Sequence, residues 1–348
     1  MSGIVGHSMY ALLGAKAAAH RGLGIAAIAG RNFPSFLAGA YLGSDIQVMP
    51  EAVCVDTGRE VGFGTVPLAK SPITGGAVRP WVLRHDGRDY RPSEIHERFY
   101  GRSHLIFGWS KAERGHTLPW ERLDAYFAAV LEDTLEFFGP SERKIAYVLG
   151  WMVHVVGDSL IKSQRAGLEL HLLDGKYTPR NRPIQDLVTF HEIGIGDFNL
   201  NWPALLADLA ATPVEPVQLH FMRVAEKRGR LAREFPELWS PESQSLLRAV
   251  LTENRRWCAF HARDVLQEME LVPAGDGRLE CNAEIRRSVG LPYREMVVLA
   301  DRANFRRALG YIGDVIADVM EATVRRAPRL EKLVGDHGPE WDAWMKRW

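Results

Sequence analysis

Apolar residues recur at helical spacing along most of this chain, and strand-like patterns are confined to short stretches. This spacing predicts helices over residues 7–20, 34–42, 119–138, 141–163, 184–193, 202–211, 216–233, 241–267, 293–325 and 339–346. Between residues 49 and 92 the pattern breaks into Gly, Pro and short β-branched runs, which favours an irregular excursion that is compatible with a hairpin and is not a second core. A hairpin is also expected over 268–281, around Gly275-Asp276-Gly277. The fold class predicted is all-α (mainly α): a multi-helix bundle with a long irregular excursion.

The composition is that of a globular protein with a large core. The chain has 348 residues, of which 46% are hydrophobic and 25% charged. That length suits one large domain or two smaller ones. We interpret 1–348 as a single mainly helical domain, with a helical core over 1–214, a candidate appended module over 215–290 and C-terminal helices over 291–348.

Charge and cysteine content exclude several classes of protein. Lys+Arg and Asp+Glu both number 43, so a general polyanion-binding surface is not indicated and there is no strong nucleic-acid signal. The three cysteines lie far apart, which argues against a disulfide framework and against a thiolate zinc site. No basic leader precedes an apolar stretch, and no uncharged apolar run reaches the roughly 18 residues of a membrane span. We therefore expect a cytoplasmic protein with no membrane span.

The run 146–160 is the most informative part of the sequence. Its apolar residues are interrupted by His154 and Asp158, four positions apart. On a helix this spacing puts both side chains on one face. The surrounding residues predict a helix that is buried nearly all round, where polar groups need partners. A divalent metal would satisfy both groups, and a structural His–Asp hydrogen bond is the alternative.

Other candidate ligands lie in distinctive contexts. His7 opens the first helix, and Asp45 lies where an apolar helix runs into Gly43-Ser-Asp-Ile. His104 lies in the aromatic-rich segment 100–109. His191 and Glu192 end a later helical stretch.

The order of these motifs resembles the bacterial zinc-dependent phospholipase C family, whose superfamily includes single-strand-specific zinc nucleases. The shared pattern is a His near the N-terminus, an apolar helix ending in Gly-x-Asp-Ile, a lone His, and Tyr-x-Leu-Gly-x-x-x-His-x-x-x-Asp. The resemblance covers roughly residues 7–195, in short islands. It implies a helical bundle that holds up to three zinc ions and hydrolyses phosphodiesters with a metal-activated water.

Carried over by motif, the resemblance implies a role for each candidate. His7, His104 and His154 would be metal ligands, and Asp158 would bridge two metals. Asp45 would be both a ligand and the candidate catalytic base. Imidazole and carboxylate ligands suit zinc, and clustered divalent ions stabilise the attacking and leaving oxygens together.

Two departures from the family pattern reduce the number of metal ligands expected in the site. No His follows Asp158 within the next two turns, and Ile195 stands four residues after His191 where the family has Glu. His191 and Glu192 could serve with altered geometry, although adjacent helical side chains point about 100° apart. We therefore expect one to three zinc ions, with other divalent metals as alternatives.

The function expected is a metal-dependent hydrolase, phospholipase C-like or phosphodiesterase-like, acting on a small-molecule or lipid-like substrate. A single-metal lyase or glycoside-cleaving enzyme remains an alternative, as does a non-catalytic member that binds a ligand or partner. Trp257 and His261 could line a pocket from the C-terminal half. The tryptophans at 341, 344 and 348 are compatible with an oligomer.

Overall fold

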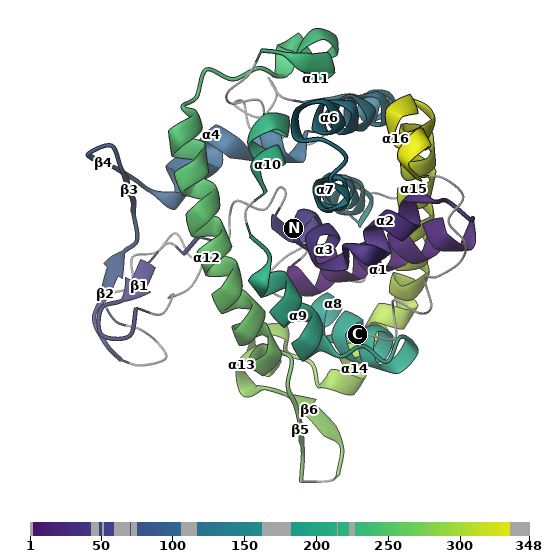
Figure 1. Ribbon diagram of the computed structural model, residues 1–348. Helices are drawn as coiled ribbons and strands as arrows, with labels where there is room; N and C mark the ends of the chain where they lie inside the picture. The colour runs from purple at the N-terminus through teal and green to yellow at the C-terminus, as the bar shows by residue number, and fades with distance from the viewer. Residues whose placement is uncertain are drawn as a thin grey trace.

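The computed structural model describes residues 3–42, 49–50, 52–58, 70, 75–105, 117–161, 182–213, 215–222, 227–275 and 277–334. Within them the chain is mainly helical, which confirms the expected fold class (Figure 1). The helices are α1 Ile4–His20, α2 Ile25–Arg31, α3 Phe33–Leu42, α4 Pro92–His104, η1 Trp120–Arg122, α6 Leu123–Phe138, α7 Glu142–Ile161, α8 Arg182–Val188, π-helix η4 Thr189–Asp197, α9 Trp202–Ala211, α10 Pro216–Phe221, α11 Gly229–Glu234, η5 Pro236–Leu238, α12 Gln244–Glu268, α13 Ala283–Val289, α14 Tyr293–Arg302, α15 Phe305–Arg325 and α16 Pro328–Val334.

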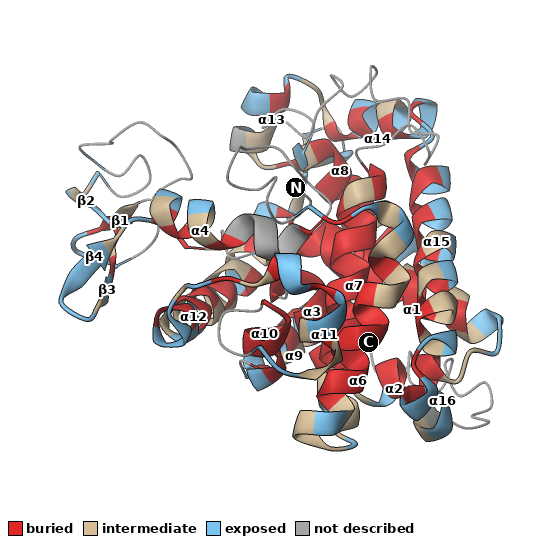
Figure 2. Cartoon of the chain, turned by 90° about the horizontal axis from the view of Figure 1, so that it is seen from above, coloured by how far each residue is buried: buried red, intermediate tan, exposed pale blue. Residues whose placement is uncertain are grey.

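Helix α7 forms the centre of the bundle, surrounded by α1, α3 and α6 (Figure 2). Every residue from 145 to 158 is buried, as the apolar run predicts. Among the described helices α7 alone has the length and apolarity of a membrane span, and 89% of its 18-residue apolar window is buried inside the protein. Burial on all sides accounts for its apolar composition, because it packs against other helices around its whole circumference.

Two glycines bring α3 and α7 unusually close together. A Cβ at Gly39 would clash with the backbone oxygen of Tyr147, and a Cβ at Gly150 would clash with that of Phe36. Because neither residue has a side chain, the two backbones pass in direct contact. This crossing fixes the end of α3 against the middle of α7.

Helix α1 is held between α7 and α15. At its crossing with α15, Gly14 lies under Ile316 and Gly313 lies against Leu13, so each helix offers a glycine to a side chain of the other. At its crossing with α7, Gly157 makes room for the ring of Tyr10. The first turns of α1 therefore lie beside the last turns of α7.

The described strands form small antiparallel pairs. β1 (Ala52–Cys54) pairs with β2 (Val78–Pro80), and β3 (Leu83–His85) pairs with β4 (Arg88–Tyr90), on one side of the bundle (Figures 1 and 2). β5 (Leu271–Pro273) and β6 (Leu279–Cys281) form the hairpin expected over 268–281. The long helix α12 packs on α9, α3, α10 and α1, so it contributes to the same core.

Several expected helices are divided or were missed. The stretch 216–233 ends as α10 at Phe221 and begins again as α11 at Gly229. The stretch 293–325 is broken at Asn304, whose left-handed φ of 59° separates α14 from α15. Helices α2, α4, α13 and α16 were not predicted, and 339–346 lies outside the described residues.

Candidate metal centre

Three of the predicted ligands meet in the core. Among the described residues, His7, His154 and Asp158 form the one group of His, Cys, Asp or Glu side chains that could hold a metal ion. One ligand atom from each lies within 4.8 Å of the other two. His7 comes from α1, and the other two lie one turn apart on α7. All three residues are fully buried.

One distance in this group is close to the ligand spacing of a coordination shell. His7 Nε2 lies 3.7 Å from Asp158 Oδ1. Two ligands of a tetrahedral zinc ion, each about 2.1 Å from the metal, stand about 3.4 Å apart. A small movement of the side chains would therefore bring the His7 and Asp158 ligand atoms to the spacing required for a shared cation.

The ring of His154 is held in a defined tautomer by α3. Its Nδ1 lies 2.8 Å from the backbone oxygen of Ala40. Since a carbonyl can only accept, Nδ1 carries the proton and Nε2 retains its lone pair. Metal-bound histidines are oriented by the same kind of bond through their second ring nitrogen. The close crossing at Gly39 places the Ala40 oxygen where His154 can reach it.

Aromatic rings enclose His7. Its imidazole stacks on that of His154, with ring centroids 4.1 Å apart and planes 11° apart. Tyr10 meets it edge-on at 5.7 Å, and Tyr41 of α3 lies at 6.1 Å, tilted by 41°. A Cβ at Gly157 would stand 2.5 Å from the Tyr10 ring, so this glycine, beside Asp158, allows α1 to approach.

The donor set fits a divalent cation of the zinc type. Two imidazoles and one carboxylate suit zinc, and sites with three protein ligands leave a coordination position for water or substrate. Burying an ionised carboxylate costs several kcal/mol unless positive charge accompanies it. A cation held among the three side chains would supply that charge.

For two other predicted ligands, Asp45 and His104, the structure describes no side chain. Asp45 lies outside the described residues. His104 is the last residue of α4, and the structure describes its backbone alone.

His191 and Glu192 lie on the π-helix η4 and are not brought into the group. His191 Nε2 donates to the backbone oxygen of Met269 at 2.5 Å, and burial lowers the pKa of its imidazole. Glu192 Oε1 accepts from the Tyr293 hydroxyl at 2.6 Å, and burial together with this carboxylate raises the pKa of that phenol. The two side chains therefore tie η4 to the end of α12 and the start of α14.

One polar residue near the metal group, His261, was only weakly indicated by the sequence. His261 of α12 reaches Tyr41, whose hydroxyl lies 3.3 Å from the imidazole Nδ1. On α12 the residues Leu251, Asn254, Cys258 and His261 follow each other at spacings of three and four, so they share one helix face. Trp257, expected to line a pocket beside His261, is buried and meets Trp81 edge-on, and its role as a pocket residue stays a prediction.

Comparison with known proteins identifies no family for this chain. No protein-family model matches this chain, and no curated protein or solved structure matches it either.

Proposed function

We propose that this chain is a metal-dependent hydrolase whose metal is held by His7, His154 and Asp158. The observation that carries the proposal is the meeting, in the core, of three ligand atoms from two helices within 4.8 Å. Zinc is the metal we propose, because the ligands are two imidazoles and one carboxylate. The phosphoester substrate class rests on the order of motifs shared with the zinc-dependent phospholipase C family.

The residues of this chain would have the following roles in hydrolysis. A divalent ion bound here would acidify water and polarise a phosphoryl oxygen. His154 offers Nε2 because Ala40 holds its Nδ1, and Asp158 contributes the negative charge. Asp45 follows α3, which ends at Leu42, and is the proposed base that takes the proton from the attacking water. Asp45 and His104 are also the proposed ligands of any second ion.

Complete burial of the three ligands favours a second candidate function. A cation that pins α1 to α7 would need no access for substrate, and closed structural sites are of this kind. In that case the metal would stabilise the fold without taking part in a reaction.

Metal content tests the site that both proposals share, and phosphoester hydrolysis decides between them. His154→Asn retains an amide donor at the position of Nδ1, so the Ala40 bond survives while the ligand atom Nε2 is lost. We expect wild type to carry at least one equivalent of zinc by plasma mass spectrometry and H154N to lose it. Hydrolysis of bis(p-nitrophenyl) phosphate should fall in parallel.

The matched control is His220→Gln. His220 is also buried and pairs with a carboxylate, through Nε2 to Asp133 at 2.8 Å, but it lies outside the metal group. The glutamine amide can take over that bond, so H220Q should keep the wild-type metal content. Wild-type protein without stoichiometric zinc, manganese or iron would overturn the proposal. Bound metal without phosphoester hydrolysis would favour the structural role.

A further inference from the structure

The last three residues of α3 are each fixed by a side chain from a different helix. The Ala40 oxygen bonds to His154 of α7, and the Tyr41 hydroxyl lies 3.3 Å from His261 Nδ1 of α12. The Leu42 oxygen accepts from Gln218 Nε2 of α10 at 2.9 Å. Carbonyls in the last turn of a helix have no partner within the helix, so such side chains decide where that turn lies.

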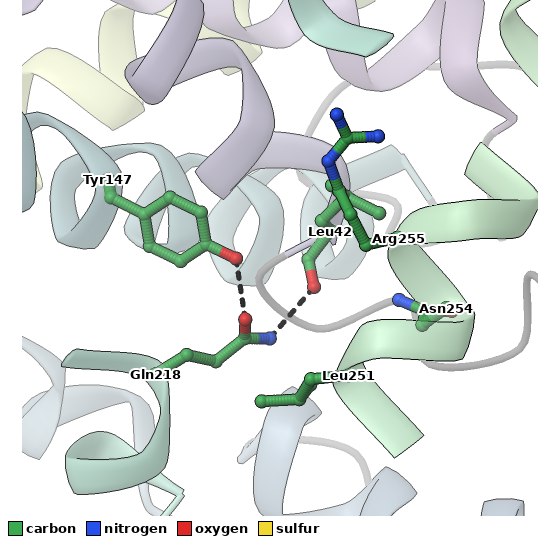
Figure 3. Close-up of a pocket in the computed structure, with 6 residues that line it drawn as sticks. All are labelled: Leu42, Tyr147, Gln218, Leu251, Asn254 and Arg255. Atoms are coloured by element: carbon green, nitrogen blue, oxygen red, sulfur yellow. Dashed lines mark hydrogen bonds between the residues drawn. The ribbon is translucent and has the colours of Figure 1, made fainter. Parts of the chain in front are cut away.

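Figure 3 shows the third of these anchors in a small pocket between α7, α10 and α12. The Tyr147 hydroxyl donates to Gln218 Oε1 at 2.7 Å, and this orients the amide toward Leu42. Asn254 of α12 lines the same pocket, and it lies on the helix face that also carries His261. The helix face that carries His261 is therefore packed firmly against the end of α3.

The second anchor connects α12 with the metal centre through a residue that is not a ligand. Tyr41 is 4% exposed, and its ring lies against the His7 imidazole. The His7 ring is thus bounded by His154, Tyr10 and Tyr41, and the hydroxyl of Tyr41 tethers its ring to α12. A rotation of the Tyr41 ring would remove one wall of the space in which the His7 ring stands.

We propose that His261 is a positioning residue of the metal centre: its bond to the Tyr41 hydroxyl holds the phenol ring against His7 and sets the coordination geometry of that imidazole. The inference rests on the proposed metal site and makes α12, which follows the region of family resemblance, part of that site. His261 does not supply a ligand atom in this arrangement, because it is not part of the group formed by His7, His154 and Asp158. Partners of this kind, which orient a ligand from outside the coordination shell, change metal affinity by about 10- to 100-fold.

Two nearly isosteric substitutions test this role. His261→Asn places an amide where Nδ1 stands and can keep the bond to Tyr41. His261→Gln places its amide where Nε2 stands and cannot. Each variant, with wild type and Tyr41→Phe, would be loaded with Co²⁺, whose visible spectrum reports coordination geometry. Affinity would be measured by competition with a chelator.

We expect H261N to match wild type in spectrum and affinity. H261Q and Y41F should shift the spectrum and weaken Co²⁺ binding about 10-fold or more. The double variant Y41F/H261Q should be no weaker than either single variant, because both remove the same bond. His85→Asn is the control: the Nε2 of His85 bonds to Ser245 near the start of α12, the asparagine amide stands where Nδ1 does and cannot replace that bond, and its loss should leave the spectrum unchanged.

The outcomes separate this inference from the proposed function. Wild type that binds no Co²⁺ overturns both. Wild type that binds Co²⁺, with H261Q and Y41F indistinguishable from it, overturns the role of His261 and leaves the metal site standing. Circular dichroism and thermal unfolding of the apo proteins show whether H261Q is folded. If it is not, the comparison of Y41F with wild type decides.

Discussion

The imidazoles of His7 and His154 lie face to face, with centroids 4.1 Å apart and planes within 11° of parallel. They belong to helices that lie far apart in the sequence, α1 and α7. The stacking is a product of helix packing. Gly157 lets α1 approach α7, and Gly39 lets α3 approach the same helix from another side.

Gly39→Ala should damage both stability and the metal centre. The added methyl would meet the Tyr147 backbone, which cannot move without displacing α7. Overpacking of this kind costs about 1–3 kcal/mol or more. We also expect weaker zinc binding, because the Ala40 oxygen would move away from His154. Urea unfolding and zinc titration measure the two effects.

Gly310→Ala is the matched control for this variant. Gly310 is also a helical glycine, in α15, but a Cβ there would meet nothing within 4 Å. Alanine should stabilise the protein by up to about 1 kcal/mol, since glycine is the weaker helix former. A Gly39→Ala variant as stable as Gly310→Ala would show that the α3–α7 crossing can relax.

Asp133 should be essential for docking α11. Its fully buried carboxylate accepts from His220 Nε2 at 2.8 Å and from the backbone nitrogens of Arg230 and Leu231 at 2.6 and 3.0 Å. Asp133→Ala leaves these donors without an acceptor, and removing one member of a buried pair costs about 3–5 kcal/mol. Urea unfolding followed by far-ultraviolet dichroism measures the loss.

An exposed carboxylate on the same helix provides the comparison. Glu136 lies 3.6 Å from Arg329 in an ion pair that is about half exposed on both sides. Exposed pairs contribute about 0–1 kcal/mol, so Glu136→Ala should change stability little. Equal effects at positions 133 and 136 would contradict the buried network.

The parts of the site that were predictable are those encoded by local spacing. His154 and Asp158 stood out because a single buried helix carries both, and periodicity alone places them on one face. His7 came from the order of motifs. That its ring stacks on His154, enclosed by Tyr10 and Tyr41, depends on the crossings of α1 and α3 with α7, which no local pattern encodes.

Errors in the predicted helices have a similar origin. Apolar periodicity runs through 293–325 without interruption, yet Asn304 adopts a left-handed conformation between α14 and α15. The break after α10 ends at Gly229, whose φ is 85° and whose Cβ position is occupied by the Asp133 carboxylate. In the second case a tertiary contact with α6 determines the backbone, so the signal lies outside the segment itself.

Glu215 should make the protein less stable as the pH rises. It is fully buried at the start of α10, and its Oε1 lies 2.7 Å from Arg143 Nε. Burial nevertheless raises the pKa of its carboxyl above the ordinary 4.5. The unfolded chain therefore loses this proton first as the pH rises through 4.5, and stability falls until the folded carboxyl also ionises.

Glu215→Gln removes this titration. Urea unfolding from pH 4 to 8 should show wild type losing stability relative to E215Q as the pH rises through and above 4.5. A difference between the two proteins that does not vary with pH would show that Arg143 fully compensates the buried charge.

His191 should act on acid stability rather than on metal binding. Burial lowers the pKa of its imidazole below the ordinary 6.5. Above that pH both states are neutral and the contribution is complete. As the pH falls through 6.5 the unfolded chain takes up a proton that the folded chain does not, so stability declines. His191→Gln can keep the donor to the Met269 oxygen without titrating, so wild type should lose stability relative to H191Q between pH 7.5 and pH 5.

Zinc content of the same variant tests whether His191 is a ligand. Its Nε2 is occupied by Met269, and the group of His7, His154 and Asp158 does not include it. We expect H191Q to retain the wild-type metal stoichiometry. Loss of one equivalent, with unfolding still cooperative, would show that His191 turns toward the metal when it is bound, as the resemblance to the phospholipase C family implies.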